Sequence, residues 1–313
     1  NPNIKKVPKF STIEVMTGAI IKKPFDTIIP IEQIRFLPNR TKPKYIVINK
    51  KIHKHNFIRF IGSDFKKGET IIKKGEIINS QHILAFKTLG IKEVVVKKKP
   101  KIVFYSTGNE ISNSNKLPYW KIRNSNSYYL KSFFKNLPFD FIEKKILRDN
   151  DLKKFQNEMT KNLKSSNDLI LTSGAVSAGK FDFVPNIIRK FKLKYSFKGA
   201  YIRPGKPLMF AKFLNNKAFF GLPGNPISSA ACLRFFVLPY LFFSISLNEI
   251  KPINAKLKNQ FIKKKNFTRF IKGNLSFTNK GIAEFKVQKG QESFRIKPFT
   301  KSNSWGLFPS GKR

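Results

Sequence analysis

The stretch Asp168-Leu169-Ile170-Leu171-Thr172-Ser173-Gly174-Ala175 decides the fold. Its apolar first half predicts a buried strand, and the loop that follows, from Thr172 to Asp182, is rich in glycine and hydroxyl groups. Two other predicted strands enter loops of the same kind: Lys101–Ser106 before Thr107-Gly108-Asn109-Glu110, and Ala218–Leu222 before Pro223-Gly224-Asn225-Pro226. Helical patterns alternate with these strands, which predicts an α/β fold with a mostly parallel central sheet flanked by helices.

The three loops are the first candidate site. The carboxyl ends of parallel strands meet at one edge of a sheet, and open α/β sheets bind ligands there. Glycine lets backbone N–H groups approach an anion closely, and the start of a following helix adds partial positive charge. We therefore expect a phosphate or another oxyanion at this edge. The candidate binding residues are Thr107, Gly108, Ser173, Gly174, Ser177, Pro223, Gly224 and Asn225.

The segment Arg203-Pro204-Gly205-Lys206-Pro207 places two cations on a stiff turn, because proline fixes φ. Cations held in place in this way suit phosphate recognition, and arginine can bind an oxyanion with two parallel hydrogen bonds. We expect Arg203 and Lys206 to contact an anionic substrate.

Carboxylates are scarce, since 18 Asp and Glu stand against 62 Lys and Arg. Glu110, Asp149 and Asp182 nevertheless lie at the ends of predicted strands or loops, and all three are candidate catalytic residues. Mg²⁺ favours one or two carboxylates together with substrate phosphates, which makes Asp182 and Glu110 candidate magnesium ligands. The alternative interpretation is ordinary charge at helix N-termini.

Composition shifts along the chain predict four parts: an all-β module over 1–78, a linking helix and strand over 79–99, a central α/β domain over 100–246, and a small C-terminal β domain over 247–313. Within the first two parts, we expect strands at Thr27–Ile31, Tyr45–Ile48 and Val94–Val96, and a helix over Ser80–Gly90.

The apolar stretch Ala230–Leu247 is interrupted by Arg234 and Pro239, so it predicts a buried helix that ends near the proline rather than a membrane span. Cys232 is the single cysteine and cannot form an internal disulfide. The three histidines have no ligand partner at metal-binding spacing, and no signal peptide is visible. These features favour a cytoplasmic protein.

The formal net charge of +44 attracts anions, and taken alone it favours a nucleic-acid binder. The lysines are spread over the whole chain, however, and Asn, Ile and Phe are abundant with them. This pattern is typical of a compositional bias, so nucleic-acid binding remains the rival interpretation.

The ordered set of motifs resembles the molybdopterin molybdenumtransferase family, the MoeA and gephyrin E-domain group. The resemblance runs along nearly the whole chain. The segments that carry it are Met16-Thr17-Gly18-Ala19, Gly62-Ser63-Asp64, Ser106-Thr107-Gly108-Asn109-Glu110, Asn124-Ser125-Asn126, Thr172–Ser177, Pro204-Gly205-Lys206-Pro207 and Leu222-Pro223-Gly224-Asn225-Pro226.

The resemblance implies an elongated homodimer that inserts molybdate into the dithiolene of adenylated molybdopterin, with Mg²⁺-dependent release of AMP. It places Asp182 and Glu110 in the central site, Asp149 near it, and Arg203 and Lys206 on the phosphate side. It also implies that Thr17 and Asp64 approach the partner subunit's site, and that the protein contacts molybdopterin adenylyltransferase.

Several positions depart from the family pattern. Asn109 and Asn124 replace residues that are usually acidic, and Ala175 replaces a glycine. The two amides should weaken the hold on a cation, and Ala175 should be costly where the loop needs a positive φ. The family's N-terminal segment, with a Met-Asp-Gly-Tyr-like motif, does not precede these residues, so we expect a chain shortened at its N-terminus.

Two alternatives stay open at this point. Molybdopterin adenylyltransferases share the central α/β fold, although their single-domain members would not need flanking β modules. A catalytically weakened scaffold or nucleic-acid-binding protein could also use the same fold without turnover.

Overall fold

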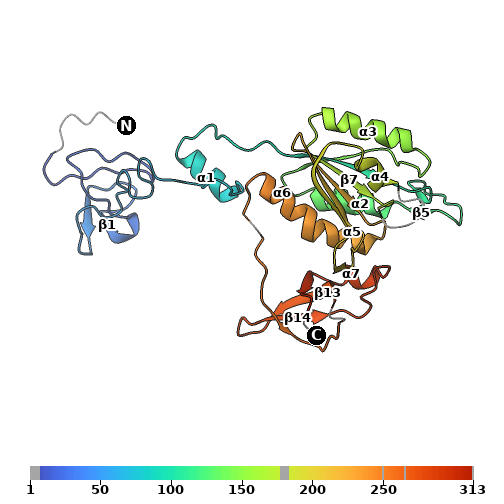
Figure 1. The fold of residues 1–313 in the computed structure, drawn as a ribbon. Coiled ribbons are helices and arrows are strands. Elements are labelled where there is room, and N and C mark those ends of the chain that lie inside the picture. The colour runs from blue at the N-terminus through green and yellow to red at the C-terminus, as the bar shows by residue number, and fades with distance from the viewer. Residues whose placement is uncertain (1–7, 177–182, 249, 264–265, 312–313) are drawn as a thin grey trace. The chain divides into compact units, whose positions relative to one another are not determined.

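The computed structural model describes residues 8–176, 183–248, 250–263 and 266–311. The chain divides into two compact units, one formed by residues up to Ile71 and the other by residues from Ile72 onward (Figure 1). The finer division at residues 100 and 247 remains a prediction.

The first unit contains a short 3₁₀-helix, η1 (Ile31–Gln33), and a hairpin of β1 (Ile34–Leu37) and β2 (Tyr45–Ile48), which pair antiparallel. The strand predicted over 45–48 is confirmed. The one predicted at Thr27–Ile31 is wrong, because Pro30 has no N–H for a ladder and the chain turns into η1 directly after it.

The second unit begins with an extended segment and α1 (Ser80–Thr88). Asn79 caps this helix: its Oδ1 accepts from the His82 N–H at 3.1 Å, and the His82 Nδ1 accepts from the Asn79 N–H at 3.2 Å. The strand predicted at Val94–Val96 is wrong, since these exposed residues are extended without a ladder partner in the part of the chain that the structure describes.

The central sheet has the strand order β6 (Asp140–Glu143), β3 (Lys101–Ser106), β7 (Leu169–Ser173), β11 (Ala218–Leu222), β10 (Met209–Phe213) and β8 (Leu193–Lys198). The first four strands run parallel, and β10 runs antiparallel to both of its neighbours. The expected mostly parallel sheet is therefore confirmed.

Helices cover both faces of this sheet (Figure 1). On β3, Ile102 and Phe104 pack on one side with α2 (Ser125–Phe134) and α5 (Pro226–Cys232), while Val103 and Tyr105 pack on the other with α3 (Leu152–Lys164) and α4 (Val184–Ile188). Apolar runs such as that of β3 are needed because a strand covered on both faces must be apolar on both.

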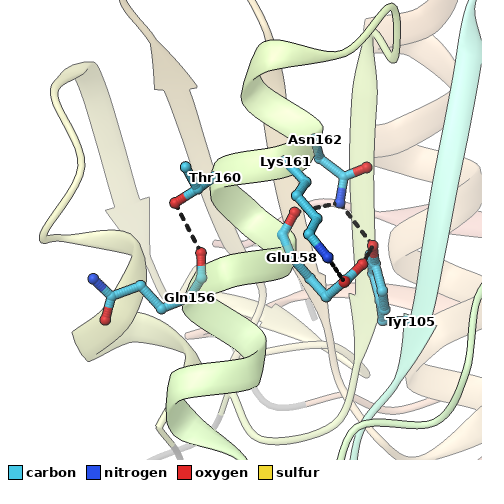
Figure 2. A network of polar contacts seen from close by, with 6 residues as sticks. All are labelled: Tyr105, Gln156, Glu158, Thr160, Lys161 and Asn162. Atoms are coloured by element: carbon cyan, nitrogen blue, oxygen red, sulfur yellow. Dashed lines mark hydrogen bonds and ion pairs between the residues drawn. The ribbon is translucent and has the colours of Figure 1, made fainter.

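A polar network ties α3 to β3 (Figure 2). The Asn162 Nδ2 donates to the Tyr105 hydroxyl at 2.7 Å, and that hydroxyl donates to the Glu158 Oε2 at 2.9 Å. Burial raises the pKa of the Tyr105 phenol, so it stays a neutral donor. The network fixes the strand just before it reaches Thr107.

The apolar helix is longer than predicted. It passes from α5 through a π-helical turn, η2 (Leu233–Val237), into α6 (Leu238–Ser244), so the expected end near Pro239 is wrong. The wider turn lets the Leu238 N–H reach the Leu233 carbonyl, and the helix continues past the proline. Residues 226–244 are long and apolar enough to cross a membrane, but 61% of the window is buried inside the protein, as in a core helix.

The C-terminal sheet contains β12 (Lys256–Leu257), β14 (Ala283–Val287), β13 (Thr268–Phe277) and β15 (Ser304–Phe308), with α7 (Lys297–Thr300) beside them. The short strand β9 (Ile202–Arg203) pairs with β13 and so brings the predicted cationic turn to this sheet. The Phe235 and Phe270 rings stack at 3.9 Å and join the apolar helix to β13. Two further short strands, β4 (Ile111–Ser112) and β5 (Ile122–Arg123), pair beside the first glycine loop.

Candidate functional site

The three predicted loops meet at the carboxyl edge of the central sheet. β3, β7 and β11 are neighbours in the sheet, and the loops continue their hydrogen bonding beyond the strands. The Thr107 N–H donates to the Ser173 carbonyl at 3.0 Å, and the Gly174 N–H donates to the Leu222 carbonyl at 3.0 Å. The described parts of these loops thus form one continuous edge, as the sequence predicts.

The glycines of this edge let the loops pack closely. Gly174 has a φ of +102°, and a Cβ there would lie 2.6 Å from the Thr107 carbonyl oxygen. The N–H groups of Gly108 and Gly174 already donate to Leu147 and Leu222. These two N–H groups are thus used within the protein, and the glycines allow the loops to pack closely.

A buried amide, which the sequence analysis did not list as a binding residue, joins the loops. The Asn126 Nδ2 donates to the Ser173 Oγ at 2.5 Å and to the Gly224 carbonyl at 2.8 Å. The Ser173 Oγ in turn donates to the Pro223 carbonyl at 3.3 Å. The Oδ1 atoms of Asn126 and Asn225 are buried and have no partner among the described residues. They are the acceptors that a ligand's donor group could use. The Asn124-Ser125-Asn126 motif was the signal for Asn126.

The first glycine loop is held by the segment 148–149. The Arg148 Nη1 donates to the carbonyls of Gly108, Asn109 and Ile111 at 3.1, 3.2 and 2.8 Å. The Asn109 N–H donates to the Asp149 Oδ2, and the Asp149 N–H donates to the Asn109 Oδ1, both at 3.2 Å. Asp149 therefore braces the loop that carries Glu110.

Glu110 lies directly over Gly108. A Cβ on Gly108, whose φ is +129°, would lie 2.5 Å from both Glu110 carboxylate oxygens. Asn124 is buried at the start of α2, where its Oδ1 accepts from the Ser106 hydroxyl at 2.8 Å. The first glycine loop thus presents one exposed carboxylate beside a set of amides.

The described residues do not contain three or more His, Cys, Asp or Glu side chains grouped closely enough to hold a metal ion. Asp182 and Ser177 lie outside the described residues. Of the two predicted magnesium ligands, Glu110 lies within the described residues.

The second glycine loop contains a strained residue. Ala175 has a φ of +53°, in the region that favours glycine. The positive φ meets the condition under which alanine is expected to be costly at this position. The cost of a left-handed residue with a Cβ is roughly 1–2 kcal/mol.

The cationic turn opens on a hollow of about 770 Å³ between α5 and the C-terminal sheet. Gly205 lets the turn lie against α5, since a Cβ there would be 2.6 Å from the Cys232 Sγ. The residues that line the hollow are Ile202, Arg203, Pro204, Gly205, Lys206, Pro207, Ser228, Phe261, Ile262, Phe267, Arg269, Gln291, Glu292, Ser293 and Phe294. We call this the cationic hollow.

Two guanidinium groups meet in the cationic hollow. Arg203 and Arg269 are register partners in the pairing of β9 with β13. Burial and then the nearby Arg203 charge lower the pKa of Arg269, and its buried Nε has no partner among the described residues. Among the described residues of the lining, Glu292 is the one acid, and its Oε2 pairs with the Arg295 Nε at 3.1 Å. The hollow is therefore arranged to receive an anion.

Two of the predicted residues lie in the first unit. Asp64 is exposed and its Oδ2 accepts from the Arg59 Nη2 at 2.6 Å, while Thr17 is exposed in a turn closed by the Ala19 N–H and the Met16 carbonyl. Their approach to a partner's site stays a prediction.

Comparison with known proteins gives the same assignment along the whole chain. Residues 1–90 match the model described as the MoeA N-terminal region (domain I and II), and residues 104–242 match the probable molybdopterin binding domain. The molybdopterin molybdenumtransferase of Staphylococcus aureus (strain COL) is 30% identical over 99% of this chain and 72% of its own length. The same enzyme of Staphylococcus epidermidis (strain ATCC 35984) has the same identity and coverage.

Among solved structures, the molybdopterin biosynthesis MoeA protein of Pyrococcus horikoshii OT3 is similar with a TM-score of 0.74 and 26% identity, over 96% of this chain and 71% of that one. Another solved structure, of a molybdopterin biosynthesis MoeA protein from Pyrococcus horikosii, gives a TM-score of 0.68 and 25% identity, over 91% of this chain and 68% of that one. The chain belongs to the molybdopterin molybdenumtransferase family, the MoeA family of molybdenum cofactor biosynthesis.

Proposed function

We propose that this protein inserts molybdate into the dithiolene of adenylated molybdopterin, and that the phosphoanhydride of the substrate is cleaved with release of AMP. Family membership supports the molybdenum transfer. The observation that carries the proposal for this chain is the pair of guanidiniums, Arg203 and Arg269, which meet in the cationic hollow and form no ion pair with an acid in the described part of the chain.

The cationic hollow suits a tetrahedral oxyanion. Arg203 and Lys206 are exposed on the turn and can move onto a ligand, whereas Arg269 is half-buried and presents its guanidinium from β13. Burial lowers the pKa of Arg269, the Arg203 charge lowers it further, and an anion between the two arginines would offset that repulsion. The oxyanion is either the phosphate of the substrate or molybdate itself.

The carboxyl edge of the sheet suits the nucleotide end of the substrate. Ser173, Gly174 and Gly224 lie side by side there, and α5 begins directly after Asn225. Because α5 also contributes Ser228 to the cationic hollow, a single ligand can contact both places. We propose that the edge loops hold the adenylate and that Arg203 and Lys206 hold the phosphate toward molybdopterin.

We propose that Mg²⁺ binds near Glu110, with Asp182 as its second carboxylate. The single carboxylate over Gly108 fits this ion, because Mg²⁺ keeps several waters and takes further oxygen ligands from substrate phosphates. When bound, the ion would neutralise charge on the phosphoanhydride. Asp149 and Arg148 would keep the Glu110 loop in position.

The first experiment measures AMP release from adenylated molybdopterin at varied molybdate concentration, for the wild type and for Arg269→Met. Loss of a charged hydrogen-bond donor should raise one KM by about tenfold or more. A change in the KM for molybdate assigns the cationic hollow to molybdate, and a change in the KM for adenylated molybdopterin assigns it to phosphate. Lys280→Met, in an exposed turn of the same sheet, is the matched control. Unchanged constants in Arg269→Met would refute the site.

The second experiment tests the carboxylates. Asp182→Ala and Glu110→Ala should each lower AMP release and raise the Mg²⁺ concentration needed for half-maximal rate. Undiminished AMP release by Asp182→Ala would remove that residue from the mechanism.

We also propose a cytoplasmic homodimer in which Thr17 and Asp64 complete the partner's site and which contacts molybdopterin adenylyltransferase. Mixing Asp64→Ala with Asp182→Ala subunits tests the first part. If the two residues belong to sites shared between subunits, half of the dimers carry one intact site, and roughly a quarter of the wild-type rate returns. No recovery after proven subunit exchange would place both residues in one subunit's site.

A further inference from the structure

A buried ammonium stands behind one wall of the cationic hollow. Lys272 lies on β13 and is 1% exposed. Its Nζ donates to the carbonyls of Gly290, Glu292 and Arg295 at 2.9, 3.1 and 3.0 Å. An ammonium group has three hydrogens, so this arrangement uses all of them.

The loop that supplies these carbonyls wraps around the same residue. The Lys272 N–H donates to the Gln291 Oε1 at 2.9 Å, and the Gln291 Nε2 donates to the Lys272 carbonyl at 2.8 Å. The Gln288 N–H also donates to the Lys272 carbonyl, at 3.1 Å. Six polar contacts made by Lys272 thus determine where residues 288–295 lie.

The outer surface of this loop faces the ligand space. This loop lines the cationic hollow together with the Arg203 turn, which lies far from it in sequence. The loop residues in the lining are Gln291, Glu292, Ser293 and Phe294. On its other side the loop borders a second hollow of about 370 Å³, which Lys289, Gly290 and Arg295 help to line. Residues 288–295 are all half-buried or exposed, so side-chain packing does little to hold this loop in place.

Burying a lysine only to hold a loop in place costs folding free energy, because its charge leaves water. Burial lowers the pKa of the Lys272 ammonium, so removing this charge from water carries a cost. A neutral side chain of similar length would avoid this cost but would leave three carbonyls without a donor. The Lys272 ammonium is thus coordinated by carbonyls as a bound cation would be, but it is covalently attached to β13.

We propose that Lys272 is a positioning residue of the cationic hollow: its ammonium gathers three carbonyls of the loop 290–295 and so fixes the wall against which the oxyanion binds. Lys272 itself does not touch the ligand. The inference rests on the proposed function for the role of the hollow, while the control of the loop by Lys272 stands apart from it.

The test compares the full-length wild type with Lys272→Ala, Lys272→Arg and Lys286→Met, an exposed lysine on β14 that serves as the control. Hydrogen exchange of residues 290–295 is measured without ligand, and molybdate binding is measured by calorimetry. Lys272→Ala should exchange faster in this loop and bind molybdate about tenfold more weakly, because the ligand must then order the wall. Lys286→Met should match the wild type in both measurements.

Chemical rescue separates this role from a general loss of folding. n-Propylammonium supplies the missing ammonium with a short stem, so it should restore slow exchange and molybdate affinity to Lys272→Ala. Tetramethylammonium at the same ionic strength has no N–H and should restore neither. Lys272→Arg provides a second route if Lys272→Ala fails to fold, since it keeps a charged donor and should retain most of the affinity.

The outcomes are distinguishable. If the wild type does not bind molybdate or phosphate but the exchange of 290–295 still depends on Lys272, the proposed ligand is wrong and the tie is real. If Lys272→Ala folds and shows wild-type exchange in this loop, the inference is overturned whatever the ligand. Equal restoration by tetramethylammonium would also overturn it, because the effect would then come from salt rather than from hydrogen bonding.

Discussion

Two loops of this protein are held by a single cation that collects three backbone carbonyls, and they differ in what surrounds that cation. Arg148 is half-buried and holds residues 108–111, which carry Glu110. Lys272 is fully buried and holds residues 290–295, which form a wall of the cationic hollow.

Because Lys272 is buried and Arg148 is half-buried, the two cations should contribute differently to the free energy of folding. Around Arg148, water can reach the carbonyls, and the paired contacts of Asn109 with Asp149 hold the loop a second time. The Lys272 side chain is itself shielded from water on β13, and the remaining contacts with the loop come from the Gln291 amide and the Gln288 N–H. Loss of the buried cation should therefore cost more folding free energy than loss of the half-buried one.

The largest expected effect comes from Lys272→Met. Methionine fills a similar volume but leaves three partly buried carbonyls without a donor, so we expect the free energy of unfolding to fall by about 3 kcal/mol. Urea unfolding followed by the fluorescence of Trp305, which is paired with Lys272 across β13 and β15, measures it. A loss below about 1 kcal/mol, within the range of an ordinary exposed hydrogen bond, would contradict the claim that burial makes the Lys272 contacts the more stabilising of the two sets.

Arg148→Met should have a smaller effect on stability, about 1 kcal/mol, because water can replace the guanidinium. The rate of AMP release should nevertheless fall, since the loop that carries Glu110 becomes less ordered, and Arg148→Lys should recover part of the rate. Steady-state kinetics and urea unfolding on the same samples check both statements. Equal stability losses for Arg148→Met and Lys272→Met would contradict the role given to burial.

Ala175→Gly should stabilise the protein by about 1 kcal/mol, since glycine removes the strain of a positive φ at modest entropic cost. Such a gain would show that the backbone of the second glycine loop is strained at Ala175, in contrast to the loops held by Arg148 and Lys272. Thermal unfolding measures the gain, and Ala178→Gly, three residues later in the sequence, provides the comparison substitution. A destabilised Ala175→Gly would show that other contacts require the alanine.

The smallest effect concerns pH. Burial lowers the pKa of Lys272, so the unfolded chain binds more protons at this residue than the folded chain does. The stability advantage of the wild type over Lys272→Met should therefore widen as pH rises through the lowered pKa, and be complete above the ordinary lysine value. Urea unfolding of both proteins between pH 7 and pH 10 tests the sign. A narrowing gap would mean that the three carbonyls outweigh the cost of burial.

The sequence predicted the carboxyl edge well, because strand patterns, glycines and hydroxyl residues are local signals. β3, β7 and β11 lie where expected, and Thr107, Ser173 and Gly224 come together as predicted. The positive φ of Ala175 was also foreseen as the condition under which that residue would be costly.

The cationic hollow was harder to predict, since its residues come from distant parts of the chain. Arg269 and Lys272 are two among 62 Lys and Arg, so their residue type carried no information. Their importance arises from the pairing of β9 with β13, which joins residues more than sixty positions apart in sequence. The passage of the apolar helix beyond Pro239 was missed for a related reason, because a π-helical turn has no clear sequence signal.

The central claim, that Arg203 and Arg269 receive an oxyanion, is tested most directly by crystals of the protein soaked in tungstate, whose metal has a strong anomalous signal. The account predicts an anomalous peak between the two guanidiniums, in the wild type and not in Arg269→Met. A peak confined to other sites, with the cationic hollow empty at saturating tungstate, would contradict it.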